Sequence, residues 1–136
     1  MYTKIQKITT KAIIERNEKI LLVKDPKGVW ELPGGRIEHG ERPKESLLRE
    51  LHEELGWKKI TINELIDVWS FTSKIENRHN HFIILVYSCA SNEKNIRKNN
   101  EYTKYKWTPI QEVKKLHMRD GYKQSIAKYL LKRKLK

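Results

Sequence analysis

Apolar residues alternate with polar ones, or follow one another in short β-branched runs, along six stretches of the chain. Both patterns are typical of strands, and polar or turn residues bound each stretch. The pattern therefore predicts strands at 8–14, 20–24, 60–62, 65–71, 82–89 and 105–108. Polar residues at 16–18, 25–28 and 75–80 predict turns, and the last of these has a long polar tip.

Two other segments, 42–55 and 122–134, repeat their apolar residues with the period of a helix. Pro43 fits the first turn of the earlier segment, and Gly56 fits the position just past its end. A shorter helix is predicted at 110–116, with Pro109 at its start. Helices and strands interleave, and hairpins join some of the strands. We therefore expect an α/β fold in which helices flank a mixed sheet.

The chain length and the apolar runs limit the kind of protein this can be. A length of 136 residues without repeats or linkers predicts a single domain over residues 1–136. The longest apolar run, Phe82 to Tyr87, is far shorter than the roughly 20 residues of a membrane span. The N-terminal residues lack the apolar stretch of a secretory signal, and the single Cys89 cannot form an internal disulfide. We therefore expect no membrane segment, a cytoplasmic location and a Cys89 that serves packing.

The charge of the chain is strongly positive, with 29 Lys and Arg against 17 Asp and Glu, a formal net charge of +12. Such a charge attracts phosphate-rich partners, so contact with RNA through a basic surface is one interpretation. Solvated surface charge is the other. The acids are concentrated, because residues 31–54 hold seven Glu against four Lys or Arg. An acidic segment in a basic protein indicates a bound cation, or else a solvated acidic face that Arg49 and nearby lysines neutralise.

The helix predicted at 42–55 places three acids together. At about 100° per residue, Glu50, Glu53 and Glu54 fall within one arc of about 100°. Leucines fall on the adjacent face and are expected to pack: Leu47, Leu48, Leu51 and Leu55. Like charges at these spacings cost a helix roughly 0.2–0.5 kcal/mol per pair, and a bound cation would reverse that effect. Carboxylate oxygens favour Mg²⁺ or Mn²⁺ over zinc.

The spacing around this helix is specific. Gly35 is followed after five residues by Glu41, then by Arg49-Glu50-Leu51, Glu53-Glu54 and Gly56. This arrangement resembles the Nudix box, and the preceding Trp30-Glu31-Leu32-Pro33-Gly34 resembles the usual approach to it. Trp57 departs from the aliphatic residue that normally ends the box. The resemblance covers residues 35–57 and implies a Nudix hydrolase with an α/β/α sandwich.

The resemblance also implies roles for the residues of the box. The metal ligands would be Gly35, Glu50, Glu53 and Glu54. Arg49 would orient the first carboxylate, and Glu41 would support the ligands or reach the metal through water. The general base is open: Glu53 or Glu54 is our first choice, and Glu31 and Glu101 are candidates outside the box.

The substrate contacts are predicted from residue type and position. Arg36 and Lys24, the basic groups nearest the box, and Arg78, on the predicted hairpin tip, are expected to contact phosphates. A nucleobase needs a flat apolar partner, and the candidates are Trp30, Trp69 and Phe82.

These observations predict hydrolysis, with Mg²⁺ or Mn²⁺, of a pyrophosphate bond in a nucleoside diphosphate linked to another group. The leading small-molecule substrate is a nucleoside or deoxynucleoside triphosphate, cleaved to the monophosphate and pyrophosphate. Removal of pyrophosphate from the 5′ end of RNA is an alternative that would use the basic surface. A nucleotide or RNA sensor that keeps the fold without catalysis is a third hypothesis. The sequence leaves the oligomeric state open.

Overall fold

The structure, a computed structural model, describes residues 3–97 and 104–135. Its elements in chain order are β1 (Thr3–Arg16), β2 (Lys19–Lys24), β3 (Trp30–Glu31), β4 (Gly34–Arg36), α1 (Pro43–Leu55), β5 (Thr61–Ile75), β6 (Arg78–Ala90), β7 (Lys104–Pro109), the 3₁₀ helix η1 (Ile110–Lys115) and α2 (Asp120–Lys134).

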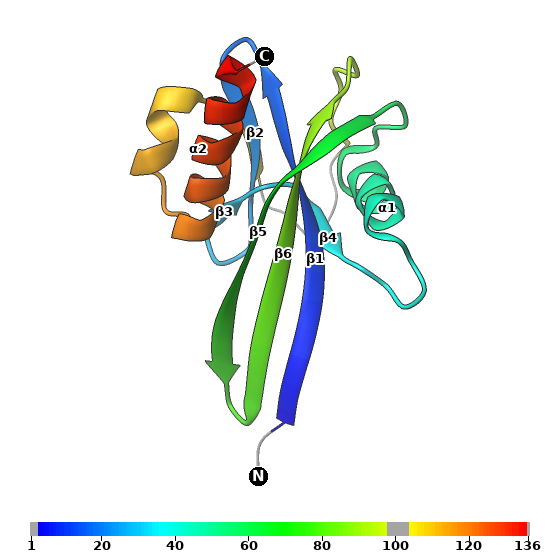
Figure 1. Cartoon of the computed structure of the whole chain (residues 1–136), viewed down its shortest axis with the longest axis vertical. Coiled ribbons are helices and arrows are strands. Elements are labelled where there is room, and N and C mark those ends of the chain that lie inside the picture. Colours follow the sequence, from blue (N-terminus) through cyan, green and yellow to red (C-terminus); the bar gives the residue numbers. More distant parts are fainter. Residues whose placement is uncertain (1–2, 98–103, 136) are drawn as a thin grey trace.

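The strands form a seven-stranded mixed sheet. Its main order is β3-β2-β1-β6-β5, while β4 pairs with β1 and β7 pairs with β2. The β1 and β6 strands run parallel, and the other pairs are antiparallel. The two α-helices lie on opposite sides of the sheet (Figure 1), so the predicted mixed sheet with flanking helices is confirmed. Within the described ranges, no helix combines the length and the apolar character that a membrane crossing needs.

Each face of the sheet carries its own apolar core. Ile13 of β1 packs on one face with Ile126 of α2, whereas Ile14 packs on the other face with Leu51 of α1. Successive side chains of a strand point to opposite faces. Because both faces are covered here, the strand is continuously apolar from Ala12 to Ile14 and does not alternate.

Two strand boundaries differ from the sequence prediction. The strands predicted at 60–62 and 65–71 are parts of one strand, β5, whose register with β6 shifts between Ile62 and Glu64 and again between Leu65 and Asp67. The long polar tip predicted at 75–80 is also wrong. Pairing between β5 and β6 continues to the Ile75–Arg78 pair, which leaves a turn of two residues with Glu76 at φ 53°.

The other differences are smaller. The β1 strand begins at Thr3, before the predicted residue 8, and β3 and β4 are short strands that the pattern did not predict. The helix predicted at 122–134 begins two residues earlier, at Asp120, and the short helix after Pro109 is a 3₁₀ helix. The first helix is confirmed, with Pro43 at its first position.

Three strands extend beyond the helices as a narrow arm, at the lower end of Figure 1. We call residues 3–7 of β1 with residues 72–82 of β5, the turn and β6 the strand arm. Polar residues are frequent in this segment because both of its faces lack a covering helix, which is why the sequence pattern indicated a loop.

Candidate active site

Helix α1 is placed on the sheet by a leucine stripe. Leu47, Leu51 and Leu55 are buried, as expected, whereas Leu48 is 40% exposed. The prediction that Leu48 packs with them is therefore wrong, because the helix turns this side chain away from the sheet. Gly56 ends the helix at φ 76°, and its N–H donates to the carbonyl of His52 at 2.9 Å.

Glu54 lies on the packed side of α1. It is only 3% exposed, and its Oε2 accepts a hydrogen bond from the Gly34 N–H at 3.2 Å. The backbone at Gly34 has φ +139°, and a Cβ there would lie 2.0 Å from the carbonyl oxygen of Thr10. Glycine is therefore required at position 34 for β4 to approach β1 and present its N–H to Glu54.

Glu50 lies directly against Gly35. A Cβ at position 35 would lie 2.3 Å from the Glu50 carboxyl carbon and from Oε2. The absence of a side chain at Gly35 therefore makes room for this carboxylate beside the main chain of β4. The carbonyl of Gly35 is reached from the other side by the Thr10 hydroxyl, at 3.4 Å.

Arg49 is the centre of the acidic cluster. Its guanidinium donates to both carboxylate oxygens of Glu41, at 2.7 and 2.9 Å, and to Glu50 Oε1 at 2.9 Å. A longer bond of 3.3 Å reaches Glu53 Oε2, and another of 3.1 Å reaches the carbonyl of Arg36. One side chain thus connects β4, the loop before α1 and the acidic face of the helix.

The hydrogen bonds from Arg49 hold the pKa of Glu41 at about 2, against an ordinary value of 4.5. The N–H of Glu38 donates to the same carboxylate at 2.8 Å and acts in the same direction. Glu41 in turn raises the pKa of Arg49, so the pair stays charged. Arg49 thus links Glu41 to Glu50, the first carboxylate of the box.

The oxygen donors of this region fit a hard divalent cation. Within residues 3–97 and 104–135, no three His, Cys, Asp or Glu side chains converge on one point that could hold a metal ion, and Arg49 bridges Glu50 and Glu53. The Glu50 carboxylate and the main chain of Gly35 nevertheless lie together. Carboxylate and carbonyl oxygens are the ligands that Mg²⁺ and Mn²⁺ prefer.

A cavity of about 520 Å³ opens beside these donors, and its lining includes Gly35, Glu50 and Arg36. Of the three predicted phosphate contacts, Arg36 therefore lies at the cavity. Lys24 and Arg78 lie outside its lining. Lys24 is placed over the ring of Trp30, with 5.4 Å from Nζ to the ring centroid, and Arg78 belongs to the strand arm.

Aromatic side chains also line this cavity. Phe82, a predicted stacking partner, lines it and stacks on Phe71 at 4.8 Å between ring centroids. The Arg119 guanidinium lies 3.7 Å from the centroid of the Phe71 ring. Trp30 and Trp69, the other predicted partners, are not part of this lining.

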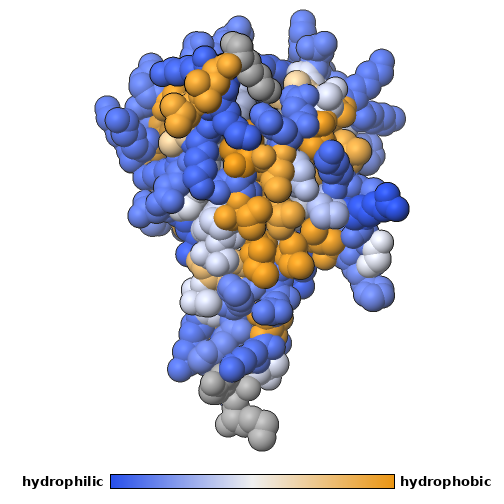
Figure 2. Space-filling model, in the orientation of Figure 1, coloured by the Kyte–Doolittle hydropathy of each residue, from blue (hydrophilic) through white to orange (hydrophobic). Residues whose placement is uncertain are grey.

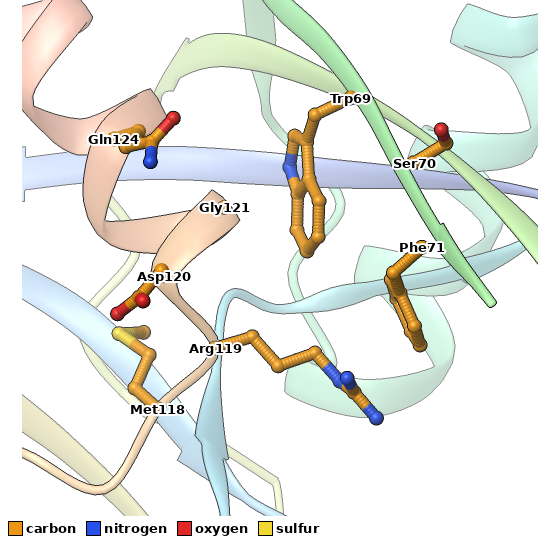
Figure 3. Close-up of a pocket in the computed structure, with 8 residues that line it drawn as sticks. All are labelled: Trp69, Ser70, Phe71, Met118, Arg119, Asp120, Gly121 and Gln124. Atoms are coloured by element: carbon orange, nitrogen blue, oxygen red, sulfur yellow. The ribbon is translucent and has the colours of Figure 1, made fainter. Parts of the chain in front are cut away.

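A second cavity of about 540 Å³ begins on the other side of Arg119 and Phe71, which line both cavities. Figure 3 shows Trp69 between β5 and the first turn of α2, with Asp120 and Gln124 projecting from the helix. A Cβ at Gly121 would lie 2.2 Å from Trp69 Cε3, so the indole ring lies flat against the helix backbone.

Several residues of the first cavity were not predicted from the sequence. Lys11, Lys27 and Arg119 add basic groups to its lining. Lys11 is only 3% exposed and forms a 3.1 Å salt bridge with Glu31, one of the alternative general bases. Lys11 could have been singled out from the sequence, because it is a charged residue beside the apolar run of β1. The other alternative base, Glu101, lies outside the described residues.

Two residues noted in the sequence contribute to packing. Burial raises the pKa of the Cys89 thiol to about 12, so this cysteine remains a neutral core residue. Trp57, the unusual end of the box, is 1% exposed, stacks with Trp107 and donates from its indole N–H to the carbonyl of Asn95 at 3.0 Å.

Known proteins resemble this chain in sequence. The family model described as NUDIX domain matches residues 6–129. The nucleoside triphosphatase NudI of Escherichia coli is 31% identical over an alignment of 115 residues, which covers 74% of this chain and 80% of that protein.

Solved structures share the fold. The MutT protein from Methanosarcina mazei Go1 has a TM-score of 0.82 at 19% identity, with 98% of this chain and 99% of that chain covered. The E. coli dihydroneopterin triphosphate pyrophosphohydrolase has a TM-score of 0.76 at 17% identity, with 94% and 99% covered. The family match, the sequence relative and the position of the box residues lead to one conclusion: the chain belongs to the Nudix family and is a hydrolase that acts on pyrophosphate bonds.

Proposed function

We propose that the protein hydrolyses a nucleoside or deoxynucleoside triphosphate to the monophosphate and pyrophosphate, with Mg²⁺ or Mn²⁺. The observation that carries this proposal is that one cavity is lined both by Glu50 and Gly35 and by the stacked Phe71–Phe82 pair. Carboxylates suit the cation that accompanies phosphates, and aromatic rings suit a nucleobase. The similarity to a nucleoside triphosphatase supports the same substrate class.

Several residues of the chain would have separate roles in this reaction. Glu50, Glu53, Glu54 and the Gly35 carbonyl would hold the cation. When bound, the cation supplies charge neutralisation for the phosphates and for the leaving oxygen. Arg49 keeps Glu50 and Glu53 in place through the bonds described above.

The proton of the attacking water needs a base. We assign it to Glu53 or Glu54 and favour Glu53, because its side chain is 56% exposed whereas Glu54 is buried against Gly34. Water oxygen attacks phosphorus, its proton passes to the carboxylate, and the bond from phosphorus to the leaving pyrophosphate oxygen breaks. Arg36 and Lys27, which line the cavity, are placed to bind phosphate oxygens.

Glu53→Gln and Glu54→Gln test this proposal. Each should lower turnover at least about 10²-fold, because the amide neither binds a cation as a carboxylate does nor accepts the proton. Folding should be retained, since glutamine has the shape of glutamate. The measurement is pyrophosphate release from a panel of nucleoside triphosphates with Mg²⁺, with Mn²⁺ and with EDTA. Full activity in EDTA or less than about 10-fold loss in both variants would contradict the assignment.

Hydrolysis at the 5′ end of RNA is the second candidate, and the formal net charge of +12 favours it. RNA-directed activity should exceed activity on the free triphosphate and should fall steeply with ionic strength, because phosphate contacts release counterions. Equal rates on both substrates would argue against it.

A non-catalytic sensor is disfavoured by the intact Glu50, Glu53 and Glu54. A wild-type rate in Mg²⁺ equal to that of Glu53→Gln would instead support the sensor.

A further inference from the structure

The strand arm has a concave outer surface that the proposed hydrolysis does not use. This hollow, of about 330 Å³, shares only Ser73 with the lining of the cavity beside Glu50. Its lining includes Lys4, Lys74, His79 and His81, together with hydroxyl and amide side chains, and it contains no described carboxylate. A hollow lined by donors and cations without an acid matches an anion.

The strand register places these groups in two rows across the three strands. Lys4 and Lys74 each pair directly with His79, so the first row runs Lys4, His79, Lys74. The next row on the same face, two residues along, is Gln6, His81 and Thr72. At about 3.3 Å per residue, the rows are about 7 Å apart. The donors therefore form a strip along the arm, which suits an extended chain of anions.

The charge of this surface is not neutralised by the protein. Of the charged residues in 3–7 and 72–82, Lys4 and Lys74 lie on this face, and the single acid Glu76 lies in the turn at the end of the arm. Within the described ranges, neither Lys4 nor Lys74 forms a salt bridge. Lys7 and Arg78 alternate with these residues along their strands and therefore lie on the opposite face of the arm. An anionic partner would balance the charge of Lys4 and Lys74.

An apolar strip adjoins the donor strip. The next row along the same face pairs Ile8 with Ile83, and Ile8 is 43% exposed. Val68, on the same face, is 53% exposed. Figure 2 shows this hydrophobic patch over the middle of β1, β5 and β6, with the hydrophilic arm below it. A nucleotide chain offers phosphates to the first strip and bases to the second, whereas a free phosphate would use only the first.

We propose that the outer face of the strand arm is a second binding site, which holds the backbone phosphates of a single-stranded nucleic acid through Lys4, Lys74 and the two histidines. The arm projects from the body of the molecule, so a strand can pass along it without contact with the helices. This site goes beyond the proposed hydrolysis, because it lies outside the catalytic cavity and needs no pyrophosphate in its ligand.

The test is direct binding of a fluorescent single-stranded RNA of about 12 nucleotides with a 5′-hydroxyl end, measured by anisotropy in EDTA. This probe has no pyrophosphate bond, so hydrolysis plays no part. The variant is Lys4→Glu with Lys74→Glu. The control, Lys114→Glu with Lys115→Glu, makes the same change in net charge at two exposed lysines of η1.

The arm variant should bind at least about 10-fold more weakly, and the slope of log affinity against log salt should fall by about 1.4, or about 0.7 for each lost phosphate contact. The η1 control should lose less than about 3-fold, and Lys4→Arg with Lys74→Arg should bind as the wild type does. Equal losses in the arm and η1 variants would overturn the inference, as would wild-type binding to anionic vesicles without binding to RNA.

Triphosphate hydrolysis, measured in the same samples, keeps the two proposals apart. It should be unchanged in the arm variant. A wild type that binds the RNA but releases no pyrophosphate would reject the proposed function and leave the arm site standing. A wild type that hydrolyses triphosphates without binding the RNA would reject the arm site alone.

Discussion

The adjacent residues Gly34 and Gly35 serve different needs, and their substitution by alanine separates fold from function. At Gly34 a Cβ would meet the backbone of Thr10, which cannot move without disturbing β1. At Gly35 it would meet the end of the Glu50 side chain, which can rotate away. Gly34→Ala should therefore destabilise the fold by at least about 2 kcal/mol. Gly35→Ala should lower activity by about 10-fold to 100-fold with a smaller loss of stability.

Urea denaturation of both variants, beside pyrophosphate release, measures this difference. Gly35→Ala tests the position of Glu50, and Gly34→Ala serves as its control for the packing of β4. Equal loss of unfolding free energy in the two variants would show that the backbone at Gly35 cannot tolerate the methyl group either.

The pKa of Glu41 makes a prediction about acid stability. Its folded-state pKa of about 2 is lower than the ordinary 4.5, so the charged carboxylate stabilises the folded state above about pH 4.5. This contribution is lost as the pH falls from about 4.5 to 2. The difference in unfolding free energy between the wild type and Glu41→Gln should therefore be constant above this window and shrink within it. A difference that stays constant down to pH 2 would show that Arg49 does not hold Glu41 in solution.

At the scale of elements, the attachment of α1 to the sheet decides where its carboxylates point. Leu51 is fully buried, whereas Leu48 is 40% exposed on the same helix. Leu51→Ala should cost about 2–5 kcal/mol of unfolding free energy, because it leaves a cavity between the helix and the sheet. Leu48→Ala, the matched control, should cost no more than about 0.5 kcal/mol.

Chemical denaturation measures both leucine variants. Comparable losses would mean that α1 sits on the sheet with a different rotation. Such a rotation would also move Glu50, Glu53 and Glu54, so the result would bear directly on the proposed metal ligands.

At the scale of the whole molecule, one sheet separates two cores that share no side chain among the residues the structure describes. Ile126→Ala perturbs the core under α2, and Leu47→Ala perturbs the core under α1. Each should cost about 2–5 kcal/mol, and the double variant should show close to the sum, because the two sites do not touch. Circular dichroism and tryptophan fluorescence should report the same urea midpoint. Separate midpoints would show that the two layers unfold independently.

The strand pattern was informative wherever a strand packs against a helix. The runs at 20–24 and 82–89 are strands because burial imposes β-branched, apolar residues on them. The polar segment at 75–80 indicated a loop, yet it consists mainly of paired strand ends in the strand arm. The pattern of apolar residues predicts a strand only where the strand is buried. A strand that no other layer covers needs no apolar residues at regular intervals, so the pattern does not predict it.

Part of the candidate site could likewise be predicted from the sequence, and part could not. The box residues lie on one helix, the strand before it and the loop between them, so the spacing and the resemblance to the Nudix box were enough to single out Glu50, Arg49, Glu41 and Gly35, which lie in contact in the structure. The rest of the cavity that Gly35 and Glu50 line is built by residues far away in the chain, among them Lys11, Phe71 and Arg119. Their contribution depends on which strands are neighbours, and single-sequence spacing does not contain that information.

The sequence by itself determined the α1 helix, with Pro43 at its first position and Gly56 just past its end, because the residues that begin and end a helix act locally. Only the tertiary structure decided that Glu54 is buried against Gly34, that Leu48 faces solvent and that Arg78, on the strand arm, is not part of the cavity lining. These outcomes follow from the docking of the helix on the sheet and from strand register, which are set by contacts between distant segments of the chain.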